Sequence, residues 1–156
     1  MARVRIFAMD VDGTLTDGKI YMGDHGETMK AFNVKDGQGI ISLERTGVIT
    51  AIITVRNTKI VQNRAQELGI KEVYQNQADK VAALKELCKK HGVSPREVAY
   101  IGDDIGDLQA IRFCGLSFCP ADAAEAVKRE VTHILSKNGG DGAVREAAEL
   151  LLRQQP

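Results

Sequence analysis

The sequence predicts an α/β fold, a three-layer Rossmann-like sandwich with a mostly parallel sheet, in one domain over residues 1–156. Short apolar runs rich in β-forming residues alternate with amphipathic stretches along the whole chain. Alternating strands and helices favour parallel strands joined by right-handed crossovers. A chain of 156 residues that is 44% hydrophobic suits one compact core.

The expected strands are short and apolar. They are Val4–Met9, Val48–Ile53, Glu72–Tyr74, Val98–Ile101, Leu116–Phe118 and Val131–Ile134. The expected helices lie between and after them, at Gln38–Thr46, Thr58–Leu68, Lys80–His91, Asp104–Phe113, Ala123–Arg129 and Ala143–Leu152. Ligands of such sheets sit beyond the carboxyl ends of the strands, so the chemistry is expected there.

The connection after the first strand is unusually long. It holds about two dozen residues, whereas a βα loop ordinarily has ~2–6. Lys19–Met22 and Thr28–Asn33 are strand-like, and residues 23–26 (Gly-Asp-His-Gly) are typical of a turn. We therefore expect an inserted β-hairpin. Because a lone two-stranded hairpin is marginally stable, we expect hairpins from several chains to pack together.

Charge and composition exclude several classes of function. The 21 basic and 21 acidic residues cancel, so no basic field favours nucleic acid or an anionic membrane. No apolar run is long enough to span a bilayer or to act as a signal peptide, which predicts a cytoplasmic protein. The 3 cysteines form no CxxC pair and are expected to be reduced.

Acidic residues gather at two predicted strand ends. Asp10 and Asp12 follow the first strand, two residues apart, a spacing that aims both side chains the same way. Asp103, Asp104 and Asp107 follow the fourth strand. Converging carboxylates repel one another unless a cation joins them, and oxygen ligands without histidine or cysteine suit Mg²⁺. Singly, Asp12 could be a turn residue, and Asp103 or Asp104 a helix N-cap.

Three further features fit a phosphate site. Thr54 ends the second strand, and Lys80 opens the helix after the third. A hydroxyl and an ammonium beside a metal would neutralise a phosphoryl group, although alone Thr54 could be an N-cap and Lys80 a surface lysine. Residues 139–142 (Gly-Gly-Asp-Gly), near Arg145, are equally consistent with a simple capping loop and with an anion-binding turn.

The string at residues 10–18, DVDGTLTDG, resembles the first motif of the haloacid dehalogenase superfamily of phosphatases. Thr54, Lys80 and residues 102–107 (GDDIGD) are similar to its second, third and fourth motifs, in order. The resemblance covers essentially the whole chain. It implies a nucleophilic Asp10 that forms an aspartyl-phosphate and an Asp12 that serves as general acid and base.

Residues 31–37 (AFNVKDG), Tyr74-Gln75 before Asp79-Lys80, and residues 139–146 (GGDGAVRE) resemble a narrower group. This is the subfamily of 3-deoxy-D-manno-octulosonate 8-phosphate phosphatases and of phosphatases of nine-carbon keto-sugar acids. It implies a capless enzyme of lipopolysaccharide biosynthesis that acts on a small phosphorylated sugar acid, and a homotetramer built by the hairpin, in which a neighbouring subunit helps to close the site.

The resemblance also implies roles for individual residues. Asp10, the Asp12 carbonyl and Asp103 would hold Mg²⁺, while Asp104 and Asp107 would orient metal-bound water or brace the loop. Thr54 and Lys80 would hold the transferring phosphoryl group. The residues implied in substrate binding are Asp12, Asn33, Val34, Lys35, Asp36, Gly37, Arg56, Arg64 and Lys80.

Three alternatives stay open from the sequence. The first is a nine-carbon substrate, which shares the keto-acid head, but that branch is expected to carry a glutamate where this chain has Arg56. Next to Arg56 this chain has Val55 where the subfamily usually has glycine, and this departure bears on the same choice of substrate. A phospho-receiver domain would need an acceptor aspartate at a later strand end, and the third strand ends in Tyr74-Gln75. A catalytically silent assembly module would not need the intact pair Asp10 and Asp12.

Overall fold

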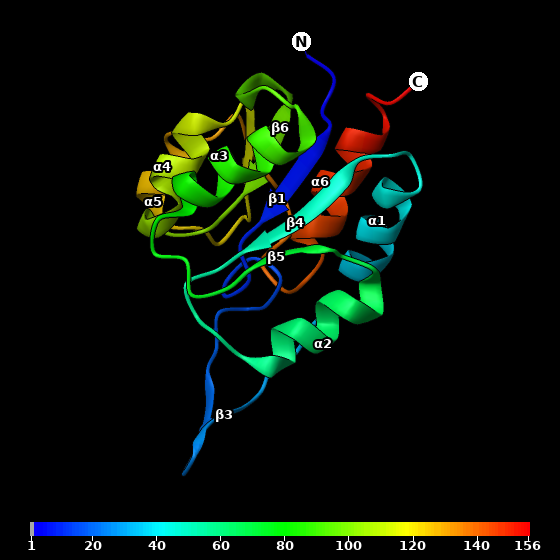
Figure 1. The fold of residues 1–156 in the computed structure, drawn as a ribbon. Coiled ribbons are helices and arrows are strands. Elements are labelled where there is room, and N and C mark those ends of the chain that lie inside the picture. Colours follow the sequence, from blue (N-terminus) through cyan, green and yellow to red (C-terminus); the bar gives the residue numbers. More distant parts are fainter. Residues whose placement is uncertain (1) are drawn as a thin grey trace.

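The computed structural model describes residues 2–156 and has a six-stranded parallel sheet at its centre (Figure 1). The strand order is β5-β4-β1-β6-β7-β8. The strands are β1 (Ile6–Met9), β4 (Ile49–Ile53), β5 (Glu72–Tyr74), β6 (Val98–Ile101), β7 (Leu116–Cys119) and β8 (His133–Ile134). The predicted α/β sandwich is confirmed.

Helices cover both faces of the sheet (Figure 1). On one face lie α1 (Val34–Glu44), α2 (Lys59–Leu68) and α6 (Ala143–Leu152); on the other lie α3 (Lys80–His91), α4 (Leu108–Phe113) and α5 (Glu125–Lys128). The side chains of β1 alternate between the two cores: Phe7 and Met9 enter the first, Ile6 and Ala8 the second. Because both faces are covered, β1 is apolar throughout rather than alternating with polar residues.

The register of the central strands brings the two acidic segments together. Met9, the last residue of β1, pairs with Ile52 of β4 on one side and with Ile101 of β6 on the other. Asp10 and Gly102 are the next residues along their strands, and the Asp10 amide donates to the Ile101 carbonyl at 3.1 Å. The carboxyl ends of β1, β4 and β6 therefore form one edge, as parallel pairing requires.

The first helix begins earlier than predicted. The sequence predicts a helix over Gln38–Thr46, but α1 begins at Val34 and ends at Glu44. The Asn33 side chain caps it by accepting the Lys35 amide at 2.8 Å, and the helix packs along α6 (Figure 1). Capping and tertiary packing outweigh the ~1 kcal/mol helical cost of each glycine.

Two other helices are shorter than expected. Between β6 and α4 the chain forms a 3₁₀ turn, Ile105–Asp107, which Asp104 caps by accepting the Ile105 amide at 2.8 Å. The helix expected at Ala123–Arg129 is the single turn α5, Glu125–Lys128. It starts late because the amide of Ala124 donates to the Asp103 carbonyl, so the residues before it belong to the loop above the site. A second 3₁₀ turn, Pro95–Glu97, precedes β6.

The inserted hairpin is present and projects away from the sheet (Figure 1). Its strands are β2 (Tyr21–Gly23) and β3 (Gly26–Met29), paired antiparallel around Asp24 and His25. The second strand was expected at Thr28–Asn33 but ends at Met29. Asn33 lies outside it because its side chain caps α1. Tyr21, Met22 and Met29 expose large apolar side chains on the hairpin. Across the described part of the chain, no helix has the length and apolar character needed to traverse a bilayer.

Candidate active site

The turn after β1 is wound tightly around one carbonyl. The amides of Thr14, Leu15 and Thr16 all donate to the Val11 carbonyl, at 2.9 to 3.1 Å. Gly13 sits in this turn with a φ of 88°, and a Cβ there would lie 1.9 Å from an Asp103 carboxylate oxygen. Only glycine allows both the backbone conformation and the close approach of the two acidic segments.

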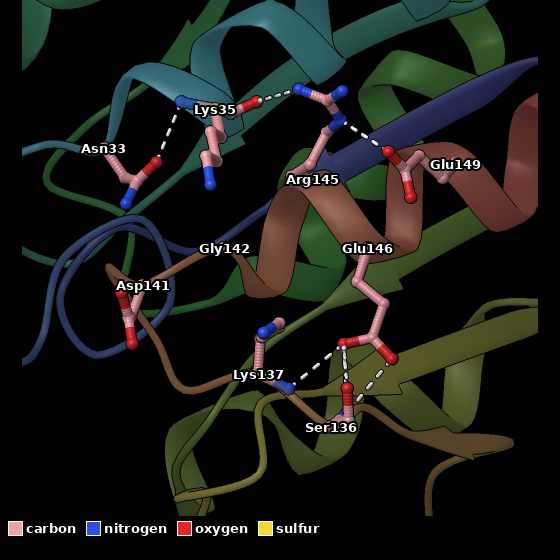
Figure 2. Close-up of a pocket in the computed structure, with 9 residues that line it drawn as sticks. All are labelled: Asn33, Lys35, Ser136, Lys137, Asp141, Gly142, Arg145, Glu146 and Glu149. Atoms are coloured by element: carbon pink, nitrogen blue, oxygen red, sulfur yellow. Dashed lines mark hydrogen bonds and ion pairs between the residues drawn. The ribbon is translucent and has the colours of Figure 1, made fainter.

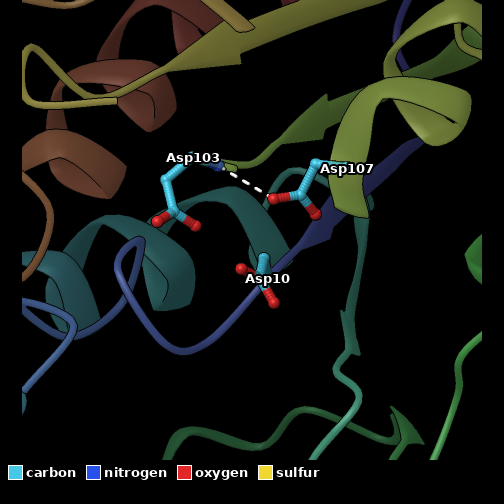
Figure 3. A group of neighbouring side chains, drawn as sticks. All are labelled: Asp10, Asp103 and Asp107. Carbon is cyan, nitrogen blue, oxygen red and sulfur yellow. Dashed lines mark hydrogen bonds between the residues drawn. The ribbon is translucent and has the colours of Figure 1, made fainter. Parts of the chain in front are cut away.

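Three carboxylates converge at this edge of the sheet (Figure 3). One oxygen each from Asp10, Asp103 and Asp107 lie within 4.8 Å of one another. Burial, then the charge of Asp107, raises the pKa of Asp10; burial, then Asp10, raises the pKa of Asp103 to about 8. Such crowding disfavours the charged forms, and a hard cation with oxygen ligands would reverse that. The donor set therefore fits Mg²⁺.

Asp107 has little capacity left to bind a metal ion. One of its oxygens accepts the amides of Asp103 and Asp104, at 2.9 and 3.1 Å. The other accepts the Lys80 ammonium at 2.7 Å and the Tyr100 hydroxyl. The side chain thus holds the loop that carries Asp103, which corresponds to the bracing role rather than to water orientation. The exposed Asp104 caps the 3₁₀ turn that follows.

Lys80 is a buried residue of the site and not a surface lysine. It is the first residue of α3, and its ammonium lies 2.9 Å from Asp10 Oδ1 and 2.7 Å from Asp107 Oδ1. Burial would lower the pKa of Lys80, but the charges of Asp10 and Asp107 outweigh it and raise the pKa. The lysine therefore stays a cation directly beside Asp10.

Thr54 and Arg56 line the same cavity as the aspartates. Thr54 follows β4 and is buried, and it is not a helix N-cap, since Thr58 caps α2 by accepting the Ile60 amide at 3.1 Å. Val55 is 53% exposed, so its bulk meets no crowding here. The cavity has a volume of about 260 Å³ and is lined by Asp10, Asp12, Thr54, Val55, Arg56, Lys80, Asp103, Asp104, Gly106 and Asp107.

Asp12 faces the hairpin rather than the other carboxylates. Its Oδ1 binds the ammonium of Lys30, the residue directly after β3, and that ammonium also binds Glu27 Oε2 at 2.8 Å. Sequence reasoning missed Lys30 and Glu27, because a lysine and a glutamate on a hairpin ordinarily point to solvent. It also missed the contact of the Tyr100 hydroxyl with Asp107, because a tyrosine in a buried strand ordinarily serves to fill the core.

The other predicted substrate residues lie elsewhere in the single chain. Arg64 stacks over the Phe32 ring, with 5.4 Å to the centroid, and donates to the Asn33 carbonyl at 3.3 Å. Asn33 and Lys35 border a separate cavity of about 520 Å³ (Figure 2), whereas Asp36 is 1% exposed. Val34 is exposed and Gly37 is buried. Within one chain, none of these side chains lines the aspartate cavity.

The loop of residues 139–142 packs on the turn after β1. The amide of Gly140 donates to the Thr14 carbonyl at 3.1 Å, and the amide of Gly139 to Asp122 Oδ1 at 3.0 Å. These two amides are therefore occupied and not free for an anion. Arg145 is paired with Glu149 at 2.7 Å (Figure 2). The arrangement favours the simple-loop interpretation, with the loop bracing the turn that carries Asp10 and Asp12.

The fold and the site together define a class. A parallel sheet presents a buried carboxylate, a lysine, a threonine and a cluster of acids that fits Mg²⁺ at its carboxyl edge. Little besides positioning and charge neutralisation is needed to transfer a phosphoryl group, and these groups provide both. The arrangement is that of an α/β enzyme of phosphoryl transfer.

The chain belongs to the haloacid dehalogenase-like hydrolase family, whose sequence pattern matches residues 69–146. It is 44% identical over 154 residues to the 3-deoxy-D-manno-octulosonate 8-phosphate phosphatase KdsC of Yersinia pestis, covering 99% of this chain and 82% of the relative. It is 43% identical over 152 residues to KdsC of Escherichia coli K12, covering 97% and 81%. The resemblance found in the motifs is confirmed.

Solved structures agree over the whole fold. The cobalt-bound phosphatase YrbI of Haemophilus influenzae superposes with a TM-score of 0.96 at 40% identity, covering 98% of this chain and 90% of that one. The 3-deoxy-D-manno-octulosonate 8-phosphate phosphatase of Moraxella catarrhalis, in complex with magnesium, phosphate and KDO, superposes with 0.95 at 45% identity, covering 98% and 88%. The phospho-receiver alternative is thereby wrong.

Proposed function

We propose that this chain is a magnesium-dependent phosphatase that hydrolyses 3-deoxy-D-manno-octulosonate 8-phosphate through an aspartyl-phosphate on Asp10. The observation that carries the proposal is the buried Asp10, held 2.9 Å from the Lys80 ammonium beside Asp103. A nucleophilic carboxylate needs a cation to approach a phosphate dianion, and the Lys80 ammonium, at the start of α3, lies beside Asp10 at the end of β1.

The reaction proceeds in two steps, transfer of the phosphoryl group to Asp10 and hydrolysis of the aspartyl-phosphate. An Asp10 oxygen attacks phosphorus as the bond from phosphorus to the ester oxygen breaks, and Asp12 gives that leaving oxygen a proton. Water then attacks phosphorus, the bond to Asp10 breaks, and Asp12 takes the proton of the water. The products are the free sugar acid and inorganic phosphate.

The surrounding residues hold the transferring group. Lys80 neutralises one oxygen and Thr54 donates its hydroxyl to another. Asp10, the Asp12 carbonyl and Asp103 would hold Mg²⁺, and the ion when bound shields the carboxylate from the charge of the phosphate. Asp107 fixes Asp103 through the two backbone amides that it accepts.

The assignment of the eight-carbon substrate is supported by two features. Relatives at 43–44% identity over nearly the whole chain bear that name. Arg56 lines the aspartate cavity, 43% exposed, where its guanidinium can bind a carboxylate remote from the phosphate. The nine-carbon phosphates share that carboxylate, so they are the comparison that tests the assignment.

We also propose a cytoplasmic homotetramer in which neighbouring chains complete the site. The hairpin exposes Tyr21, Met22 and Met29, which an isolated chain would leave in water. Arg64 and the segment Asn33–Gly37 lie outside the aspartate cavity of their own chain. Their predicted contact with substrate would then be made to the cavity of a neighbouring chain.

The decisive experiment measures phosphate release with Mg²⁺ from the eight-carbon and nine-carbon phosphates side by side. The proposal predicts a higher kcat/KM for the eight-carbon ester, a loss of that preference in Arg56→Ala, and no turnover in a folded Asp10→Asn. Since one methylene-sized difference is worth ~1–3 kcal/mol, some cross-reactivity is expected. Preference for the nine-carbon ester would overturn the substrate, and an inert wild-type protein would favour the assembly module.

A further inference from the structure

The ammonium of Lys30 is enclosed by acidic side chains beside the catalytic turn. Its side chain is 1% exposed and contacts both Asp12 and Glu27. Glu27 is itself 7% exposed on its side chain, and its second oxygen lies 4.0 Å from Arg56 Nε. Four charges of alternating sign thus run from the catalytic turn, through the hairpin, to Arg56.

A stabilising role alone accounts poorly for this burial. Removing the Lys30 ammonium and the Glu27 carboxylate from water costs several kcal/mol per ion, and apolar side chains of similar volume often serve stability as well or better. Lys19, which precedes the same hairpin, shows the ordinary behaviour, because its side chain is 75% exposed. Burial of the Lys30 ammonium against Asp12 is therefore unfavourable for stability by itself, which points to a role other than stabilisation.

The contact decides where the Asp12 carboxylate points. Asp10, Asp103 and Asp107 form the acidic cluster, and among the residues that the structure describes Asp12 is not a member of it. Its Oδ1 is turned instead toward the hairpin, where Arg56 lines both the aspartate cavity and a second cavity shared with Glu27. This is the side on which the sugar would lie.

We propose that Lys30 is a positioning residue that holds the Asp12 carboxylate toward the leaving oxygen of the substrate, and that Glu27 fixes Lys30 in turn. This inference rests on the proposed function, in which Asp12 transfers the proton. A proton donor has to remain within hydrogen-bond reach of its target, ~2.6–3.2 Å, in the reacting complex. Without Lys30 the Asp12 carboxylate is free to rotate toward the acidic cluster.

The dependence of the rate on the leaving group tests this role. An alkyl phosphate needs a proton on its leaving oxygen, whereas the p-nitrophenolate ion leaves readily without one. The parameter to compare is kcat/KM, which covers only the steps up to release of the leaving group and so omits the later hydrolysis of the aspartyl-phosphate, where Asp12 acts as base on either ester. General acid catalysis is worth ~10²–10⁴-fold, so Lys30→Met should lower kcat/KM on the sugar phosphate by roughly 10–100-fold. On p-nitrophenyl phosphate kcat/KM should stay within about 3-fold of wild type, because Asp10, Thr54 and Lys80 remain.

The controls separate positioning from general damage. Asp12→Asn should show the same leaving-group selectivity at larger size, and Lys19→Met should match wild type on both esters. Glu27→Gln keeps Lys30 in place but loosens it, and should show a smaller selective loss; it carries the test if Lys30→Met fails to fold, which circular dichroism reports.

Equal losses on both esters, or no loss on the sugar phosphate, in both Lys30→Met and Glu27→Gln would overturn the inference and leave the phosphatase assignment standing. A wild-type protein inert toward both esters with Mg²⁺ would instead overturn the proposed function. The two failures are therefore distinguishable in one set of measurements.

Discussion

Asp36 is a buried carboxyl group, and its contribution to the free energy of unfolding should change with pH. It lies in the first turn of α1 and is 1% exposed. One oxygen accepts the Arg145 amide at 2.9 Å, at the start of α6, while Oδ2 has no hydrogen-bond partner within residues 2–156. Burial raises the pKa of this carboxyl to about 6 from 3.8.

The size of the effect follows from linkage. A rise of about two pKa units, at ~1.4 kcal/mol per unit, means that the charged carboxylate costs the folded state roughly 3 kcal/mol. Below the unfolded pKa of 3.8 both states hold the proton and the cost vanishes. As pH rises toward 6 the folded state keeps a proton that the unfolded state has lost, so stability falls, and above that pH the full cost remains.

The variant Asp36→Asn removes the charge and keeps an acceptor for the Arg145 amide. It should raise the free energy of unfolding by up to ~3 kcal/mol at about pH 7.5, and by much less at about pH 4.5. Urea unfolding at one fixed protein concentration measures both values, since oligomer stability depends on concentration. Glu86→Gln, on the exposed surface of α3, is the matched control and should stay within about 0.5 kcal/mol.

A gain that is the same at both pH values, or a loss at the higher pH, would refute the reasoning. The first result would mean that the effect comes from packing or helix propensity rather than from charge. The second would mean that the carboxylate is stabilised in the folded protein by a cation or donor, and that its burial costs nothing.

Three further predictions concern the site and the assembly. Lys80→Met leaves Asp10 without its cation and should lower kcat by about 100-fold or more; a variant with wild-type kcat would remove Lys80 from the mechanism. Gly139→Ala would put a Cβ 1.9 Å from the Gly13 carbonyl oxygen, and should cost about 1–3 kcal/mol in urea unfolding and lower kcat as well; unchanged values would show that the loop does not brace the turn. Met22→Glu, at a hairpin position 61% exposed, should reduce the mass in light scattering, and an unchanged mass would separate the hairpin from assembly.

Local patterns were enough to predict the architecture and the acidic cluster. Short β-rich runs and amphipathic stretches alternate along the chain, and on that pattern β5, β6 and α3 were predicted with their observed limits. Parallel pairing places strand ends on one edge, so Asp10 and Asp103 could be expected together from their positions alone. The first inference needs only short-range patterns, and the second adds the rule that alternating strands and helices build a parallel sheet.

Boundaries failed where partners distant in sequence decide them. The start of α1 depends on its packing against α6 more than a hundred residues later, as the contact from Arg145 to Asp36 shows. The start of α5 depends on the Asp103 carbonyl. Propensity reasoning around Gly37 or Ala123 has no access to such contacts.

By itself, the sequence determined the α/β sandwich, the family, and the carboxylates, threonine and lysine at the strand ends, because each is encoded by periodicity or by a motif within a few residues. Only the tertiary structure decided that Lys80 is buried between Asp10 and Asp107, that Lys30 holds Asp12, and that Arg64 lies away from the aspartate cavity of its own chain. The physical reason is that a charged side chain looks the same in sequence whether water or a buried partner of opposite charge surrounds it, and folding alone brings those partners together.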